Sequence, residues 1–274
     1  MSTARWSESF GAAALSSMDV YESVMVPRMF TPWAELLLDE LELAPGETVL
    51  DVACGPGSVA RLAAARVGAQ GQVTGCDLSA AMLAIAEGKP AVSGGCKIEY
   101  HEAPAERLPV DDDAFDVVTC QQGLQFLPDR PAALAEMRRA LRPAGRVGIA
   151  VWTEIDRSPP VCALGNALEA VAGAELADRY RGGPWGFTDG EALRALIESA
   201  GFDDVRLSRR TLPVAFEGGA AQLLSTLVVT PLAAEIDSLS DEQRGRLVEI
   251  LVDEVGGGPI ESELESNVAL ARRV

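Results

Sequence analysis

The sequence predicts an α/β fold in which a mostly parallel sheet carries helices on both of its faces. The first observation is an alternation of strand and helix signals between residues 48 and 152, which is typical of parallel strands joined by right-handed crossovers. The second is a glycine turn, Cys54-Gly-Pro-Gly57, between a strand signal and a helix signal. Of the 274 residues 48% are hydrophobic, which is enough for a sizeable core.

The elements of this alternation follow one another in a regular order. Apolar runs predict the strands, and apolar positions at helical spacing predict the helices. Residues 4–43 are predicted to be helical, with Pro32 in a first helical turn and Pro45-Gly46 as the stop. The predicted strands are 48–53, 72–77, 97–101, 115–120 and 146–152, and the predicted helices between them are 58–67, 79–87 and 130–141.

After Trp152 the pattern changes. Residues 153–188 are predicted to be a cap insertion, with a helix at 161–178 and a loop rich in glycine and aromatic residues. A helix at 189–200 stops at Gly201. The remaining predictions are a strand at 205–214, helices at 219–236 and 240–255, and an edge strand at 261–273.

One domain, 1–274, is the simplest division of the chain. It would consist of an N-terminal helical segment (1–45), a ligand-binding core (46–152), the cap insertion (153–188) and a C-terminal part that completes the sheet (189–274).

The first predicted strand leads into a ligand-binding turn. Glycine lets a ligand approach the backbone closely, and the start of the next helix offers unpaired N–H groups. Asp51, near the end of this strand, adds a fixed negative charge that a phosphate site would not favour. The turn therefore indicates a cationic ligand with an amino group.

The next predicted strand ends in a second carboxylate, Asp77, about 20 residues after the glycines. At this spacing a carboxylate binds ribose hydroxyls in doubly wound nucleotide folds. Leu78 and Met82 follow and would pack on an adenine face. The alternatives are that Asp77 only caps the following helix and that Leu78 and Met82 belong to the core.

At these residues the chain resembles the class I S-adenosylmethionine-dependent methyltransferases, in particular the branch of the ubiquinone/menaquinone C-methyltransferases. The resemblance runs from about Trp6 to Arg273 and rests on five motifs, namely Asp51–Gly57, Asp77–Met82, Ala105-Glu-Arg-Leu-Pro109, Phe115–Cys120 and Leu141-Arg-Pro-Ala-Gly145. It implies a Rossmann-like sheet of seven strands whose last strand is antiparallel, which would place 205–214 beside 261–273.

The resemblance also implies roles in binding S-adenosylmethionine. Asp51, Ala53 and the backbone of Gly55 and Gly57 would hold the aminoacyl part, and Asp77 the ribose. Leu78, Met82 and Ala105 would contact the adenine, Gln121 the methionine moiety through its backbone, and Tyr21 lies in a segment that often closes over the cofactor. Many relatives have Asp where this chain has Pro104, so Glu106 or a main-chain carbonyl would have to serve the adenine amino group.

Candidates for the acceptor side are less specific. His101 is the only histidine and a candidate general base, although a lone histidine is more often structural. Gln122 and Gln125 would orient a substrate or, equally, cap the following helix. Four aromatic residues, Trp152, Tyr180, Trp185 and Phe187, would line an apolar pocket or anchor the cap.

Composition limits the function classes. The net charge of −18 disfavours nucleic-acid substrates. The five cysteines lack metal-site spacing, and no metal is expected. Without a signal peptide or a long apolar run, the chain is predicted to be cytoplasmic and free of the membrane. The expected partner is a small molecule, and a homodimer stays open.

The predicted function is methyl transfer from S-adenosylmethionine to a small organic molecule, at O, N or C, in secondary metabolism. Two alternatives remain. A nicotinamide-dependent oxidoreductase fits the G-x-G-x-x-A pattern at Gly55–Ala60. A cofactor-binding cyclase, isomerase or non-catalytic module would share the same motifs.

Overall fold

The computed structural model describes residues 20–229 and 232–274. Contacts divide the chain into two compact units. The sheet unit comprises Phe30–Thr153, Phe187–Arg210 and Ser266–Val274. The helical unit comprises Glu154–Gly186, Thr211–Glu265 and the described residues up to Met29. The part of the predicted N-terminal helical segment before residue 20 lies outside the described residues.

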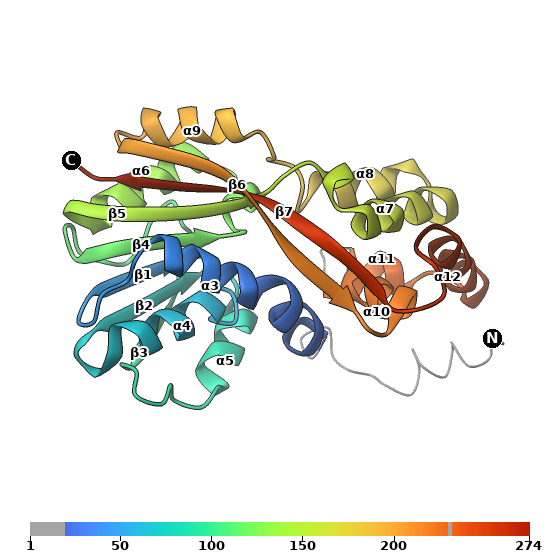
Figure 1. Ribbon diagram of the computed structural model, residues 1–274, viewed down its shortest axis with the longest axis horizontal. Coiled ribbons are helices and arrows are strands. Elements are labelled where there is room, and N and C mark those ends of the chain that lie inside the picture. Colours follow the sequence, from blue (N-terminus) through green and yellow to red (C-terminus); the bar gives the residue numbers. More distant parts are fainter. Residues whose placement is uncertain (1–19, 230–231) are drawn as a thin grey trace. The chain divides into compact units, whose positions relative to one another are not determined.

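In the described part of the chain seven strands form one sheet, in the order β3-β2-β1-β4-β5-β7-β6 (Figure 1). Strands β1 to β5 are parallel to one another, and β7 is antiparallel to β5. The bounds are β1 Thr48–Val52, β2 Gln72–Asp77, β3 Ile98–Glu102, β4 Phe115–Gln121, β5 Leu141–Trp152, β6 Asp203–Phe216 and β7 Ile260–Arg272. The predicted sheet is confirmed, including the neighbouring pair formed by the last two strands.

Helices cover both faces of the sheet, as predicted. The helices that pack on β1 to β5 from one side are α3 Thr31–Glu40, α4 Ser58–Val67 and α5 Ala80–Gly88. The other face carries α6 Arg130–Ala140 and α9 Gly190–Ser199. A short 3-10 helix, η2 Gly68–Gln70, lies between α4 and β2, and another, η3 Leu124–Phe126, lies between β4 and α6. Alternate residues of β5 show why both faces are buried. Val147, Ile149 and Val151 join the core with α6 and α9, whereas a side chain at Gly148 would press on Leu37 of α3.

The prediction that 261–273 forms an edge strand is wrong. In the sheet β7 lies between β5 and β6, and its residues from Ser266 to Ala271 are all buried. The edge is β6, which carries Pro213 and many exposed residues, as expected for a strand with one unpaired side. The apolar run Val268–Ala271 is typical of a strand that is buried on both faces, and the two arginines that follow it do not mark an edge.

The helical unit consists mainly of helices, and it includes the two longest of the described chain, α7 and α12. Its elements are η4 Ile155–Arg157, α7 Pro159–Ala172, α8 Ala174–Gly182, α10 Gly219–Ser225, η5 Thr226–Val229, α11 Ala233–Asp237 and α12 Asp241–Val255. The single helix predicted at 161–178 is two helices, because Gly173 adopts a left-handed conformation with φ of 91° between α7 and α8. The helix predicted at 219–236 is likewise interrupted, after Ser225.

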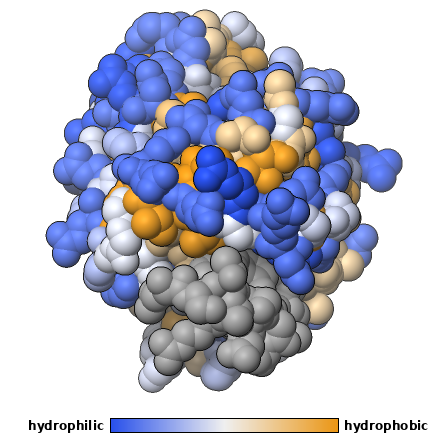
Figure 2. All heavy atoms as spheres, turned by 90° about the vertical axis from the view of Figure 1, so that its right-hand side faces the viewer, coloured by the Kyte–Doolittle hydropathy of each residue, from blue (hydrophilic) through white to orange (hydrophobic). Residues whose placement is uncertain are grey.

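Polar contacts connect these helices. Arg179 of α8 pairs with Glu235 of α11 at 2.5 Å, and Asn166 of α7 donates to Glu254 of α12. Figure 2 shows hydrophobic residues near the middle of one face, with hydrophilic residues around and between them. The described large apolar side chains that are exposed, Leu78, Phe126 and Val274, belong to the sheet unit. None of the helices in the described part of the chain combines the length and apolar character that a bilayer crossing requires.

The described N-terminal segment begins with η1 Tyr21–Phe30, a π-helix that includes Pro27. The helix α3 follows, with Pro32 in its first turn as predicted. Within the helical unit, Arg28 of η1 forms an ion pair with Glu217 at 2.8 Å.

Candidate active site

The turn after β1 lies at the carboxyl edge of the parallel strands, where ligands bind in open α/β sheets. Ala53, Gly55 and Gly57 all have positive φ, of 55°, 52° and 83°. Gly57 is the N-cap of α4 and offers no side-chain hydrogen bond to it. Non-glycine residues in this conformation are uncommon, and such strain concentrates at functional sites. The predicted glycine turn therefore exists, and its backbone conformation is typical of a functional site.

Asp51 is directed into the protein. Its carboxylate is 1% exposed and accepts hydrogen bonds from Thr119 Oγ1 at 2.8 Å and from the Ala60 N–H at 3.1 Å. Desolvation raises the pKa of Asp51 to about 7 against the lowering effect of these two hydrogen bonds. The structure thus shows Asp51 fastening β4 and α4 to β1. Its predicted direct hold on a ligand stays a prediction.

Asp77 joins the second strand to the glycine turn. One carboxylate oxygen accepts from the Gly55 N–H and the other from the Ser79 N–H, both at 2.8 Å. The N-cap of α5 is Ser79, whose hydroxyl accepts from the Met82 N–H. Asp77 is therefore not the simple helix cap of the alternative interpretation, and its partly exposed carboxylate stays beside the turn.

The residues predicted to contact adenine lie at the same edge. Leu78 is 71% exposed and Met82 is half-buried, so Leu78 is not a core residue. The Ala103 N–H donates to the Asp77 carbonyl, which brings the loop with Ala105 to the end of β2. Ala105 is buried, and Glu106 accepts from the Asp129 N–H at 3.4 Å.

The last residue of β4 and the segment after it present three glutamines. Gln121 donates through Nε2 to the Phe30 carbonyl at 3.0 Å, and Gln122 donates to Ser266 Oγ at 2.8 Å. Gln125 is 5% exposed, and neither amide atom has a partner among the described residues. Buried polar groups without partners are rare in native proteins and need an explanation.

These glutamines are not helix caps. The N-cap of α6 is Asp129, which accepts from the Ala132 N–H, and Gln122 has a φ of 52°. A Cβ added at Gly123 would lie 2.6 Å from the Cβ of Ala53, so the segment after β4 rests directly on the end of β1. The predicted cofactor and acceptor segments therefore meet at one edge.

His101 lies farther from this junction than the sequence suggested. It is on β3, the outer strand, in register with Cys76. Two strands separate β3 from β4, a span of about 14 Å at the usual strand spacing. The structure does not place His101 beside the glutamines, and its catalytic role stays a prediction.

The four predicted aromatic residues divide between the two units. Trp152 is 4% exposed and packs edge-to-face on Trp33, with ring centroids 5.7 Å apart. Tyr180 and Trp185 pack on each other in the helical unit, with ring centroids 5.3 Å apart. Trp152 and Tyr180 are buried, and each packs on an aromatic partner within its own unit, so both the pocket and the anchoring interpretation stay predictions. Tyr21, also named from the resemblance, lies on η1.

Phe187 belongs to the sheet unit and lies under Arg130, whose guanidinium is 4.5 Å from the ring centroid. Arg130 also donates to the carbonyls of Leu124 and Gln125. This arginine therefore fixes the short helix that carries Gln125. Sequence reasoning missed Arg130 and also Thr119, which strand periodicity places on the same face of β4 as Gln121.

Three buried cysteines, Cys54, Cys76 and Cys120, lie near Asp51 and the glycine turn. All five cysteines of the chain lie within the described residues, and none forms a disulfide. Burial and the nearby Asp51 raise the pKa of Cys76 and of Cys120 to about 12, and raise the pKa of Cys54 as well. Cys96 and Cys162 are partly exposed. In residues 20–229 and 232–274, no three His, Cys, Asp or Glu side chains gather as a metal site would require.

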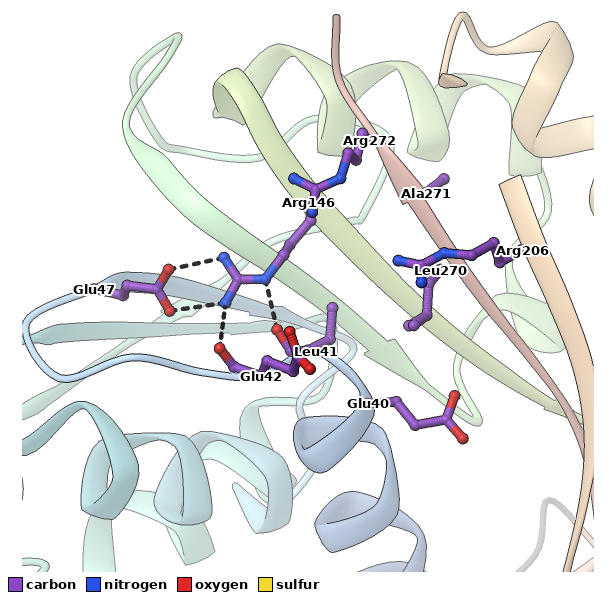
Figure 3. A pocket seen from close by; sticks show the side chains of 9 residues that line it. All are labelled: Glu40, Leu41, Glu42, Glu47, Arg146, Arg206, Leu270, Ala271 and Arg272. Carbon is purple, nitrogen blue, oxygen red and sulfur yellow. Dashed lines mark hydrogen bonds and ion pairs between the residues drawn. The ribbon is translucent and has the colours of Figure 1, made fainter. Parts of the chain in front are cut away.

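A separate hollow of about 220 Å³ lies at the opposite, amino-terminal edge of the sheet (Figure 3). There Arg146 donates to both carboxylate oxygens of Glu47 and to the carbonyls of Leu41 and Glu42. Desolvation raises the pKa of Glu47, but the hydrogen bonds from Arg146 and Ala44 outweigh it and hold the pKa below its usual value. This arginine ties the connection before β1 to β5, which is a structural role.

The sheet order, the antiparallel β7 and the glycine turn beside Asp77 are those expected of a Rossmann-like S-adenosylmethionine-dependent methyltransferase. The model of the ubiE/COQ5 methyltransferase family matches residues 5–217. The chain belongs to this family.

Individual relatives agree with this assignment. The "Ubiquinone/menaquinone biosynthesis C-methyltransferase UbiE" of Paraburkholderia phymatum is 32% identical over 203 residues, which cover 70% of this chain and 82% of the relative. A phosphoethanolamine N-methyltransferase 2 of Haemonchus contortus, solved with phosphomonomethylethanolamine and S-adenosylhomocysteine, has a TM-score of 0.59 at 17% identity and covers 100% of this chain and 60% of its own. The [4+2]-cyclase SpnF has a TM-score of 0.52 at 18% identity, covering 86% and 80%. The two structural likenesses concern the fold.

Membership of this family decides against one of the two alternative functions. The chain is a methyltransferase that uses S-adenosylmethionine, and the nicotinamide-dependent oxidoreductase suggested by Gly55–Ala60 is not retained. The described residues at the carboxyl edge fit this cofactor, because they offer a partly exposed carboxylate, an exposed leucine and a buried amide oxygen without a partner.

Proposed function

We propose that this methyltransferase transfers the methyl group to a small organic acceptor, with carbon as the receiving atom. The carbon acceptor is suggested by the relatives, which are named as C-methyltransferases of ubiquinone and menaquinone biosynthesis. The observation that carries the small-molecule proposal is the buried amide of Gln125, which has no partner among the described residues and follows two residues after Gly123, the residue that rests on Ala53. A setting in secondary metabolism stays a prediction.

When bound, S-adenosylmethionine supplies a methyl group already activated on a sulfonium. We assign the ribose to Asp77, the adenine to Leu78, Met82 and Ala105, and the aminoacyl part to the turn at Ala53–Gly57. The proposed work of the protein is to orient the acceptor and exclude water, which lowers a barrier by about 7–11 kcal/mol in favourable cases.

The acceptor side is assigned to Gln122, Gln125 and Phe187. Gln122 is held by Ser266, and Arg130 holds both the Gln125 backbone and the Phe187 ring. Neutral amides can orient hydroxyl or carbonyl groups but cannot remove a proton at neutral pH. This set therefore suits an acceptor whose nucleophilic form is already accessible in water, such as an electron-rich phenolic ring.

The test is a methyl-transfer assay with radiolabelled S-adenosylmethionine and a panel of quinols, phenols, amines, RNA and protein. Label on the ring carbon of a small molecule, with one S-adenosylhomocysteine released per methyl, supports the proposal. Label only on RNA or protein would defeat it. Substrate conversion without S-adenosylhomocysteine would instead indicate a cyclase or isomerase.

A matched pair of variants sharpens the assay. Gln125→Leu removes the unpartnered amide, whereas Gln72→Leu removes an exposed amide at the opposite edge of the sheet. The first is expected to raise KM for the acceptor or lower kcat by about tenfold or more, as for the loss of a buried hydrogen bond. The second should leave both constants unchanged.

A further inference from the structure

In the side-chain amide of Gln121, the nitrogen forms a hydrogen bond and the oxygen has no partner among the described residues. Its Nε2 donates to the Phe30 carbonyl at 3.0 Å, and because a carbonyl only accepts hydrogen bonds, this contact fixes the orientation of the amide. Its Oε1 is buried and has no partner in the described part of the chain. An amide oxygen in this position calls for a hydrogen-bond donor.

The carboxylate that the sequence offered for the same task is engaged elsewhere. Both oxygens of Asp51 have partners, Thr119 Oγ1 and the Ala60 N–H, and the side chain is 1% exposed. Each oxygen could accept a second hydrogen bond, but the burial of the side chain closes Asp51 to a ligand ammonium. Gln121 is only partly buried, and its Oε1 still lacks a hydrogen-bond donor among the described residues.

Strand geometry brings Gln121 to the right edge. Asp51 pairs with Thr119 in the register of β1 and β4, and Gln121 follows on the same face of β4, one step closer to the carboxyl ends. There Gly123 rests on Ala53, the first residue after β1. The Gln121 amide therefore lies at the junction between the glycine turn and β4.

Resting on the proposed function, we propose that Gln121 Oε1 accepts a hydrogen bond from the α-ammonium of S-adenosylmethionine. Gln121 then contacts the aminoacyl part of the cofactor with its side chain as well as with its backbone. Asp51 acts as a positioning residue, because it holds Thr119 on β4 and Ala60 on α4. The Phe30 carbonyl orients the amide from the start of α3.

The experiment compares two nucleosides by calorimetric titration. One is S-adenosylhomocysteine, and the other is its analogue with hydrogen in place of the α-ammonium. Gln121→Met is expected to weaken S-adenosylhomocysteine binding by about 10- to 100-fold and to change binding of the analogue by less than about twofold, as for the loss of a hydrogen bond to a charged group. Gln72→Met is the control and should change neither affinity.

Two outcomes overturn the proposal, namely equal losses for both nucleosides and no loss for either. If Gln121→Met does not fold, Gln121→Glu decides, since it keeps an acceptor oxygen. It should preserve or increase the preference for S-adenosylhomocysteine over the analogue, and a reduced preference would reject the contact. Failure of the proposed function is distinguishable, because the wild-type protein would then methylate no small molecule whatever Gln121 does.

Discussion

Replacing Asp51 with asparagine is expected to change how the stability of the protein depends on pH. Burial raises the pKa of Asp51 from 3.8 to about 7 in the folded chain. Below about pH 4 the carboxyl group is protonated in both the folded and the unfolded chain. Between about pH 4 and 7 the folded chain keeps the proton that the unfolded chain loses, so the free energy of unfolding falls as the pH rises.

The size of the effect follows from this window. Each pH unit within it corresponds to about 1.4 kcal/mol, so wild type should lose about 2 kcal/mol between pH 5 and 7 relative to the variant. Asparagine does not titrate, and it can keep both contacts by accepting from the Ala60 N–H and donating to Thr119 Oγ1. Above about pH 8 the difference should become constant.

The assay is urea denaturation of both proteins at several pH values between 5 and 8.5, without cofactor. Asp253→Asn is the control, since Asp253 is an exposed carboxylate on α12. We expect the free energy of unfolding of wild type minus that of Asp51→Asn to fall steadily from pH 5 to 7. A difference that stays flat or rises over this range would refute the reasoning, because it would mean that Asp51 is ionised in the folded chain.

Three further substitutions test the site. Asp77→Ala should weaken S-adenosylhomocysteine binding by about 1–3 kcal/mol in calorimetric titration without unfolding the protein, whereas unchanged affinity would mean that Asp77 only ties Gly55 to Ser79. Gly57→Ala should destabilise the fold by at least about 1–2 kcal/mol, because φ is 83° and the new Cβ would lie 2.4 Å from Tyr100 Oη. Tyr100→Phe should recover part of this loss in urea denaturation, and no recovery would exclude the clash. Arg130→Met should cost about 1–3 kcal/mol in the same measurement, and Arg130→Lys should not restore it, since lysine lacks the planar group that lies on Phe187; full rescue by lysine would contradict this.

Much of the sheet could be predicted because its signals are local. Val49, Leu50 and Val52 sit in a short apolar run, and the glycine turn marks where it ends. Side-by-side placement of the last two strands came from the family resemblance. The position of β7 inside the sheet was not predicted, because the place of a strand in the sheet order depends on long-range pairing, here with β5 and β6.

The site was predictable in its composition but not in its orientation. Asp51 and Asp77 occupy similar positions at neighbouring strand ends, yet one is buried against Thr119 and the other remains partly exposed. The direction of a side chain depends on partners distant in sequence. The positive φ of Ala53 and Gln122 was equally hidden, because neither residue type signals a left-handed conformation.

The distribution of thiols has a practical consequence for measuring motion. Cys54, Cys76 and Cys120 are shut away in the core, whereas Cys96, in the sheet unit, and Cys162, in the helical unit, are partly open to reagents. A maleimide dye should therefore attach at one natural position on each unit without any engineered residue. Energy transfer between the two dyes would then measure whether a nucleoside changes the distance between these two positions.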